Sequence, residues 1–477
     1  MPKPSSSSSN FAMKKCYRQE NNVDADCSCC HLKEKQEETD AEDQISRLPN
    51  DVLVLILSHL PMKDAAKTNI LSRRWRYLWT FFTGTLDFDA SLTLEELRFP
   101  LGSGNLNSLR EERLRFVRWV DQVLGLHQAL TVDGLRIIFD VGYECDVDNW
   151  VKFALDKKVQ KLELDFTDLR MADYSELYAF PSHLFENSNP SSLTALHLKR
   201  VNVTGGTLEC LLSHCPFLEV LSVKNSSSLL SLNIWGPTLK LKYLEIWGCR
   251  NFEKLEISAV NLLSFSYRGP EVVHFKHVPQ LLELSVAGSF FKVVVDKLFK
   301  HLSFLSQLKT LNLHFTGPLK LIMTGPQQFP ELNNLKYLEL KVSLLEFGDL
   351  FLLAPLLRAS PSLHKLTLLI CYAEMSSGDL QTLIDEHTYH CLKVVEFIGF
   401  VGSTAEVEFL LHLSKNSVSL EKMIIDPCRP YPLGELFKSR SQILKSKFRE
   451  TKEYLLAKER AIELQQKLPS DLEIVVL

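Results

Sequence analysis

Hydrophobic and polar residues follow one short pattern along most of the chain. From Val132 onward the sequence repeats apolar-x-x-apolar-x-apolar, and the last two apolar positions alternate with polar ones as in a half-buried strand. Successive copies begin 19 to 34 residues apart, at Val132/Leu135/Ile137, Val159/Leu162/Leu164, Leu193/Leu196/Leu198, Leu218/Leu221/Val223, Leu241/Leu244/Ile246, Leu262/Phe265/Tyr267, Leu281/Leu284/Val286, Leu308/Leu311/Leu313, Leu335/Leu338/Leu340, Leu363/Leu366/Leu368, Leu392/Val395/Phe397 and Leu420/Met423/Ile425. Such a period is typical of coils that stack in a row, each contributing one strand. We therefore predict an α/β fold, a solenoid with a parallel sheet on its concave face.

A second set of apolar residues falls between the strands of residues 218–286. Its members are Leu229/Leu232/Ile234, Phe252/Leu255/Ile257 and Val272/Phe275. About ten residues per half-coil are too few for a helix with two turns, so we predict extended segments there. Longer connections have room for helices, which are predicted at Val147–Lys157, Thr207–His214, Leu350–Ala359 and Thr404–Lys415. Pro355 makes the third of these the least regular.

The repeat pattern does not reach residues 83–131. Thr83–Arg110 contains three glycines and a proline and is expected to be loop-like. Glu111–His127 carries apolar residues at helical spacing, which predicts a helix with one buried face. We expect this helix to cap the open end of the array.

The segment Ile45–Phe82 has more apolar surface than it can bury by itself. Six consecutive apolar residues run from Val52 to Leu57 and are framed by an Asn50-Asp51 cap and Pro61. Periodicity alone leaves open whether this run is a helix or a buried strand. Segments below about 40 residues seldom fold without a partner, a metal or disulfides, and this one has no cysteine. Something else must cover it.

Two further short helices are expected in the same segment. One restarts at Pro61, and the other spans Leu71–Trp79 with Ser72 as its cap. The segment carries Leu48-Pro49, Val52, Ile56-Leu57, Leu60-Pro61, Asp64, Ala65-Ala66, Thr68, Leu71-Ser72-Arg73-Arg74-Trp75 and Leu78-Trp79. With these residues it resembles an F-box, of the kind seen in plant F-box proteins with leucine-rich repeats.

The F-box resemblance implies a partner and a set of contact residues. It implies docking on a Skp-type adaptor and, through it, on a cullin, a RING subunit and a ubiquitin-conjugating enzyme. The residues it implies for adaptor contact, or for the hairpin that presents the contact, are Leu48, Pro49, Val52, Ile56, Leu57, Leu60, Pro61, Leu71, Trp75 and Trp79. Six basic residues against two acidic ones give this segment a local charge of +4.

A second resemblance lies near the end of the repeats. Leu392–Phe400, Gly402-Ser403, Glu406–Leu410 and Leu420–Ile425 form a strand, a turn, a helix capped by Ser403 and a second strand. In this order they resemble the FBD module of many plant F-box proteins, over residues 391–430. Ser441–Leu468 then predicts a long helix, and Pro469–Leu477 predicts a final strand that covers the last sheet edge.

Composition narrows the function classes. A net charge of −4 gives no reason to expect nucleic-acid binding, and no run approaches the ~20 apolar residues of a membrane span. Residues 1–44 are Ser-rich, then acidic, and are expected to be disordered; Cys16, Cys27, Cys29, Cys30 and His31 there match no zinc pattern. The other cysteines fit reduced thiols in an intracellular protein of nucleus or cytoplasm, with Cys249, Cys371 and Cys428 pointing inward at equivalent repeat positions.

No catalytic, metal or cofactor motif stands out, so we expect no enzyme activity, no cofactor and no metal. His387, His390 and Cys391 form the densest ligand-like cluster outside the tail, and we interpret them as turn residues. Concave positions are mixed in charge and type, which suggests a polar protein target of unknown identity: Glu163, Asp165, His197, Lys199, Glu245, Trp247, His314 and Glu339.

Two functional hypotheses follow. The first is a substrate-recognition subunit of a Skp-cullin-F-box ubiquitin ligase, in which the F-box (45–82) docks on the adaptor and the repeats (132–390) bind the target. The second is a non-catalytic repeat scaffold or ligand sensor that does not support ubiquitin transfer. The remaining segments are the tail (1–44), the linker with its capping helix (83–131), the FBD-like repeats (391–430) and the C-terminal helix and strand (431–477).

Overall fold

The computed structural model describes residues 45–91, 93, 105–140, 147–166, 177–186, 190–236, 238–270, 272–288, 303–318, 329–344, 349–371, 387–429, 449 and 451–477. The tail predicted to be disordered, with its four cysteines and His31, lies outside this part. The chain divides into two units, Met1–Leu48 and Pro49–Leu477. The described part of the first contains the short 3₁₀ helix η2 (Ile45–Arg47).

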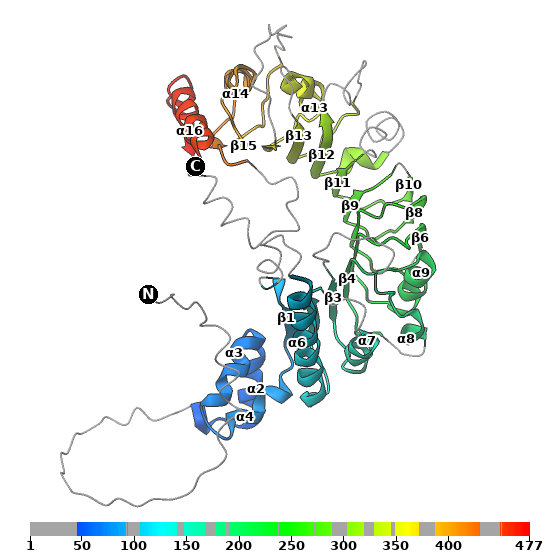
Figure 1. Ribbon diagram of the computed structural model, residues 1–477. Coiled ribbons are helices and arrows are strands. Elements are labelled where there is room, and N and C mark those ends of the chain that lie inside the picture. Colours follow the sequence, from blue (N-terminus) through cyan, green and yellow to red (C-terminus); the bar gives the residue numbers. More distant parts are fainter. Residues whose placement is uncertain are drawn as a thin grey trace, which may run out of the picture. The chain divides into compact units, whose positions relative to one another are not determined.

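One long parallel sheet runs through the second unit (Figure 1). Its fourteen described strands follow chain order, with β6, β8 and β10 left out of the row. They are β1 (Thr85–Asp89), β2 (Gly134–Ile138), β3 (Lys161–Asp165), β4 (Ala195–Lys199), β5 (Val220–Lys224), β7 (Tyr243–Trp247), β9 (Ser264–Arg268), β11 (Glu283–Ala287), β12 (Thr310–Pro318), β13 (Tyr337–Leu344), β14 (Lys365–Ile370), β15 (Val394–Ile398), β16 (Lys422–Asp426) and β17 (Glu473–Val476). All twelve strands expected from the repeat, and the C-terminal strand, are confirmed.

The two faces of this sheet differ in chemistry. The second and fourth residues of a typical strand are buried, as are Leu135 and Ile137 of β2 and Leu162 and Leu164 of β3, each at most 1% exposed. Register pairs these leucines and isoleucines across neighbouring strands, so their side chains stack in continuous rows. Fully burying such a side chain stabilises the fold by about 1.5–3 kcal/mol. The first, third and fifth residues point to the opposite side, which we call the polar face.

The extended segments expected between residues 218 and 286 are also confirmed. β6 (Ser231–Trp235), β8 (Lys254–Ser258) and β10 (Val273–His277) form a second parallel sheet in the order β10-β8-β6. Its β6 edge is capped by a helix side chain, because the Glu209 carboxylate accepts a hydrogen bond from the Asn233 amide at 2.8 Å. Such capping blocks the pairing of further strands on that edge.

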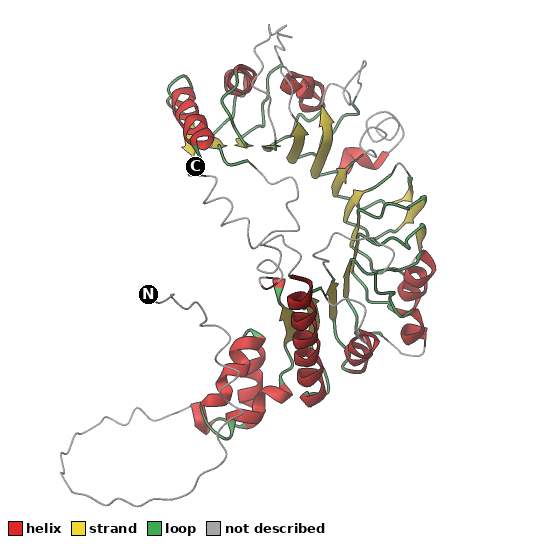
Figure 2. Ribbon diagram, viewed as in Figure 1, coloured by secondary structure: helices red, strands yellow, loops and turns green. Residues whose placement is uncertain are grey.

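Helices lie in several of the other connections, on the side away from the polar face (Figure 2). Three predicted helices are confirmed, as α7 (Val147–Asp156), α9 (Gly205–His214) and α14 (Thr404–Asn416), and a fourth, with Pro355 near its start, is split into η8 (Asp349–Leu353) and α13 (Ala354–Arg358). Shorter elements are α8 (Ser182–Glu186) and η7 (Ser303–Gln307). The helix predicted over Ser441–Leu468 is shorter than expected: α16 (Lys452–Gln465) begins after Thr451, whose extended backbone and side chain cap it, and residues 441–448 lie outside the described part.

The prediction for residues 83–131 was partly wrong. Thr85–Asp89 is the strand β1, with Leu86 and Phe88 buried, and it pairs in parallel with β2. The expected helix begins earlier, as α6 (Asn105–Leu126), and connects β1 to β2. It therefore covers the first coil, and Trp119 packs on Phe88 with ring centroids 4.9 Å apart. It is a crossover helix within the array and not a cap beyond it.

Residues 50–81 form short helices as predicted. They are α2 (Asn50–Ser58), α3 (Met62–Lys67), η3 (Thr68–Ile70), α4 (Trp75–Leu78) and η4 (Trp79–Phe81). The expected Asn50 cap is not formed, because Asn50 is already helical and its side chain accepts a hydrogen bond from Arg74 Nε at 2.7 Å. Ser72 does act near the start of α4, where its Oγ accepts a hydrogen bond from the Trp75 amide at 3.4 Å.

Candidate functional site

The F-box-like helices have an interior of their own. Leu53 and Leu57, one turn apart on α2, are fully buried, and Trp75 and Leu78 of α4 are 5% exposed. Leu57 and Trp75 were both in the predicted contact set. Their burial assigns them to the hairpin that presents a docking surface, and not to the surface itself.

Other apolar residues of the same helices face outward. Seven of them are between 38% and 78% exposed, and we call them the F-box apolar surface: Leu55, Ile56, Leu60, Ile70, Leu71, Tyr77 and Phe81. Of the remaining predicted residues, Pro49 and Pro61 are exposed, and Leu48, Val52 and Trp79 are half-buried. Leu55, Ile70, Tyr77 and Phe81 were missed, because an apolar residue on a short helix looks the same in sequence whether it is inside or outside. Outward leucines and aromatics on one small element are typical of interaction sites.

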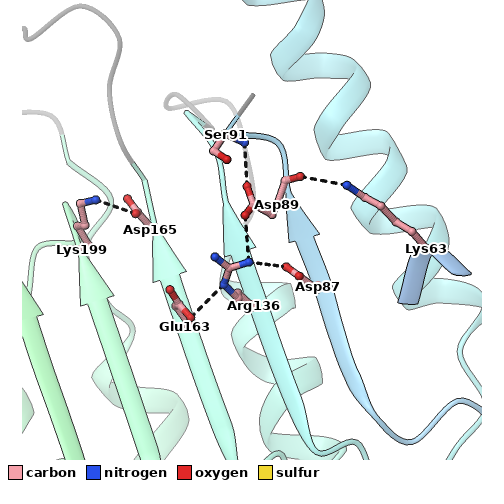
Figure 3. Close-up of polar contacts among 8 residues, drawn as sticks. All are labelled: Lys63, Asp87, Asp89, Ser91, Arg136, Glu163, Asp165 and Lys199. Carbon is pink, nitrogen blue, oxygen red and sulfur yellow. Dashed lines mark hydrogen bonds and ion pairs between the residues drawn. The ribbon is translucent and has the colours of Figure 1, made fainter. Parts of the chain in front are cut away.

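The hairpin is hydrogen-bonded to the first coil of the repeats. Ser58 Oγ accepts a hydrogen bond from the Thr83 amide at 2.9 Å. Figure 3 shows a second contact, in which Lys63 Nζ donates to the Asp89 carbonyl at 3.5 Å. His127, after α6, lies 2.7 Å from the Phe82 carbonyl through Nε2. Burial, together with Lys157, lowers the pKa of His127, so the neutral ring donates from Nε2 to that carbonyl.

A charged network occupies the polar face at the start of the sheet (Figure 3). Arg136 of β2 lies between two strands: its Nη1 is 2.9 Å from Asp87 and 3.0 Å from Asp89 of β1, and its Nε is 3.2 Å from Glu163 of β3. Burial alone would lower the pKa of Arg136, but Asp87 and Glu163 raise it. One guanidinium thus ties three strands together.

The next strands repeat this arrangement with single pairs. Lys199 of β4 is 2.9 Å from Asp165 of β3, and Lys224 of β5 is 2.8 Å from Glu245 of β7. Ser222 donates to the other oxygen of Glu245 at 2.7 Å. The concave residues picked out from the sequence do lie on this face, mixed in charge as expected. From β1 to β7 the charges largely neutralise one another.

Burial disfavours the thiolate form at three described cysteines, Cys215, Cys249 and Cys371. Cys249, Cys371 and Cys428 are buried at their repeat positions, and no disulfide joins any two of the six described cysteines. Burial raises the pKa of Cys215 to about 12 and that of Cys249 to about 11, so both are protonated thiols at neutral pH.

Other candidate chemistry is sparse in the described ranges. His387, His390 and Cys391 line a small cavity together with leucines such as Leu363 and Leu392. No group of three or more His, Cys, Asp and Glu side chains that could hold a metal ion occurs among the residues described. Within those same residues, no helix combines the length and the apolar character needed to cross a bilayer.

A buried carboxylate organises the penultimate coil. Glu406, in the first turn of α14, is fully buried, and its Oε2 accepts hydrogen bonds from the amides of Val401, Gly402 and Ser403 at 2.8–3.1 Å. Ser403 Oγ accepts from the Glu406 amide, which completes a capping box. Burial raises the pKa of Glu406 to about 7, against the opposing effect of these hydrogen bonds.

Comparison with known proteins agrees with this architecture. Residues 45–83 match the F-box domain, and residues 186–477 match the family described as "At1g61320/AtMIF1, LRR domain". Among curated proteins of Arabidopsis thaliana, F-box/LRR-repeat protein At3g58900 is 32% identical over 262 residues, which cover 50% of this chain and 74% of that protein. F-box/FBD/LRR-repeat protein At4g26340 is 24% identical over 81% of this chain and 93% of its own length.

A solved structure of the yeast Rad7 and Elc1 complex aligns at 14% identity, over 71% of this chain and 87% of that one, with a TM-score of 0.22 that supports no inference. The family matches span both the helical hairpin and most of the sheet, and they confirm the predicted fold class. The chain is a plant F-box/LRR-repeat protein whose repeats belong to the At1g61320/AtMIF1 LRR-domain family.

Proposed function

We propose that this protein is the substrate-recognition subunit of a Skp-cullin-F-box ubiquitin ligase. The F-box docks on the Skp-type adaptor, which links it to the cullin, and the repeats hold the target protein. The observation that carries the proposal is the F-box apolar surface, which remains outside a hairpin whose own interior is filled by Leu53, Leu57, Trp75 and Leu78. A partner that covers this surface removes its apolar area from water, which stabilises the complex by about 25 cal/mol per Å² of apolar area buried.

Charge around the surface supports an acidic partner. Arg73 and Arg76 are exposed beside it, whereas Lys67 is paired with Asp64 at 2.7 Å. Arg is enriched at the anchors of interfaces because its guanidinium forms directional hydrogen bonds with carboxylates. The adaptor patch that fits here is apolar with an acidic rim.

The proposed role in catalysis is proximity. Two of the thiols whose pKa burial raises, Cys215 and Cys249, remain protonated, and we propose that the cysteine that carries ubiquitin belongs to another chain. Holding a target lysine near a charged conjugating enzyme raises its effective concentration.

We further propose that residues 391–430 are an FBD module. Its strand, capped helix and strand are present as β15, α14 and β16, and the names of two similar Arabidopsis proteins, At4g26340 and At5g56370, include FBD. In this reading the module closes the solenoid together with α16 and β17.

Recovery of a Skp-type adaptor with the purified full chain tests the docking proposal. Ile70→Asp and Leu71→Asp place a charge on the F-box apolar surface without touching its interior, and we expect each to reduce adaptor recovery about tenfold or more, which corresponds to at least ~1.4 kcal/mol. Val418→Asp is the matched control, because Val418 is an equally exposed apolar residue (70%) before β16. Equal adaptor recovery with all three variants and the parent would refute the proposal.

A further inference from the structure

Among the described residues, charge pairing on the polar face is interrupted from β9 to β13 and resumes where Lys365 of β14 lies 2.7 Å from Glu396 of β15. From β1 to β7 the cations Arg136, Lys199 and Lys224 each lie within 3.2 Å of a carboxylate oxygen on their own or a neighbouring strand. Two later cations on this face, Arg268 of β9 and Lys341 of β13, make no ion pair within the described part of the chain.

These two cations stand in one row. Register pairs Arg268 with Ala287 of β11, Ala287 with His314 of β12, and His314 with Lys341. Residues paired in a parallel sheet point to the same side, so all four side chains rise from the polar face. Ala287 has a small side chain and is itself fully buried, so the longer side chains of Arg268, His314 and Lys341 carry the polar groups of this row.

The neighbours of the row are an aromatic ring, a hydroxyl group and one carboxyl group. Arg268 lies over the Trp247 ring at 5.6 Å, and His314 Nε2 is 3.3 Å from Ser343 Oγ. Burial lowers the pKa of His314 to about 4, and Lys341 and Arg268 add to the effect. The acid nearest in sequence on this face, Glu339, is two residues from Lys341 and makes no ion pair with it among the described residues; burial raises the pKa of Glu339.

Half-buried cations that make no ion pair among the described residues carry a desolvation cost that an ion pair would offset in part. A ligand that brings carboxylates to the row would recover that energy. Arg268 and Lys341 are three strand spacings apart, roughly 14 Å at ~4.8 Å per step, and an extended peptide covers this distance in about four residues.

We propose that Arg268, His314 and Lys341, with the Trp247 ring beside them, bind an acidic segment of the target protein. The segment lies extended across β9 to β13 and places two carboxylates about four residues apart, one on each cation. This inference rests on the proposed function of the repeats as the target-binding part.

The test uses the full chain and a fluorescent peptide with two glutamates separated by three residues. Its partner peptide has glutamine at both positions. We expect the glutamate peptide to bind at least tenfold more tightly, and Arg268→Met and Lys341→Met each to weaken it about tenfold, the equivalent of ~1.4 kcal/mol. Both substitutions remove the charge and retain an unbranched side chain of similar length. Thermal denaturation verifies that the variants fold. Lys199→Met, at a paired cation in an equivalent position of the same face, should leave the affinity within about twofold.

Tryptophan fluorescence supplies a second readout. Peptide binding at Arg268 should change the emission of the parent, and Trp247→Phe should abolish most of the change while polarization still detects the peptide. Equal binding of the glutamine peptide, equal weakening by Lys199→Met, equal binding of a single-stranded oligonucleotide, or no peptide binding at millimolar concentration would each overturn the inference. Adaptor recovery is measured on the same preparation, so intact adaptor binding with no peptide selectivity refutes only this inference and leaves the docking proposal standing.

Discussion

Glu406 makes the stability of the C-terminal coils depend on pH. Its carboxyl is fully buried, and burial raises its pKa from 4.5 to about 7. A folded state with the raised pKa binds the proton more tightly than the unfolded chain does, so this group contributes most stability at low pH. That stability is lost as pH rises from the unfolded pKa through the folded one.

The size of the effect follows from the two pKa values. Between pH 5.5 and 8.5 they predict a loss of about 2 kcal/mol in the free energy of unfolding from this one group. Glu406→Gln keeps an oxygen that can accept the amide hydrogen bonds of residues 401–403 but cannot ionise. We expect the variant to gain about 2 kcal/mol relative to the parent when pH is raised from 5.5 to 8.5.

Urea unfolding followed by circular dichroism at both pH values measures this difference. Glu408→Gln, on the same helix but only half-buried, is the control. It should change the free energy of unfolding by the same amount at both pH values. If Glu406→Gln and the parent differ by the same amount at pH 5.5 and 8.5, the reasoning about burial is wrong.

Two further predictions concern backbone and packing. Gly402 has φ +76°, and a Cβ there would lie 2.5 Å from Arg460 Cδ of α16. Gly402→Ala should therefore destabilise the C-terminal coil by about 1–3 kcal/mol in urea unfolding. Its control, Gly206→Ala, has open space and an ordinary helical backbone and should be neutral or stabilising. Leu57→Ala should destabilise the F-box helices by about 2–5 kcal/mol and speed amide exchange in α2, whereas Ile56→Ala, 42% exposed, should cost less than about 1 kcal/mol. Equal losses within either pair would contradict the packing described here.

Much of the sheet was predictable because each strand carries the same short apolar signal. The exception is β1, where Leu86 and Phe88 alternate correctly but Thr83 replaces the first apolar residue of the pattern. Without that residue the strand resembles a loop, and the helix that follows it resembles an end cap. Pairing with β2, which sequence periodicity does not report, is what makes it a strand.

The candidate site was less predictable than the fold. The run from Val52 to Leu57 is apolar on every side, so its sequence does not show that Leu53 and Leu57 turn inward while Leu55 and Ile56 turn outward. The polar face presents the reverse difficulty. Its residues could be assigned to the correct side. Whether a lysine there is paired, as Lys199 is, or makes no ion pair with any described residue, as at Lys341, depends on which side chains reach one another across strands.

The junction between the hairpin and the first coil is only Phe82–Gly84, between η4 and β1. Hydrogen bonds at Thr83 and Phe82 bridge this junction, so no flexible linker separates the docking helices from the coils. In the proposed ligase, a target bound to the coils therefore keeps a fixed position relative to the docking helices. The proposed function then implies that the position at which a target binds along the coils determines which of its lysines receive ubiquitin.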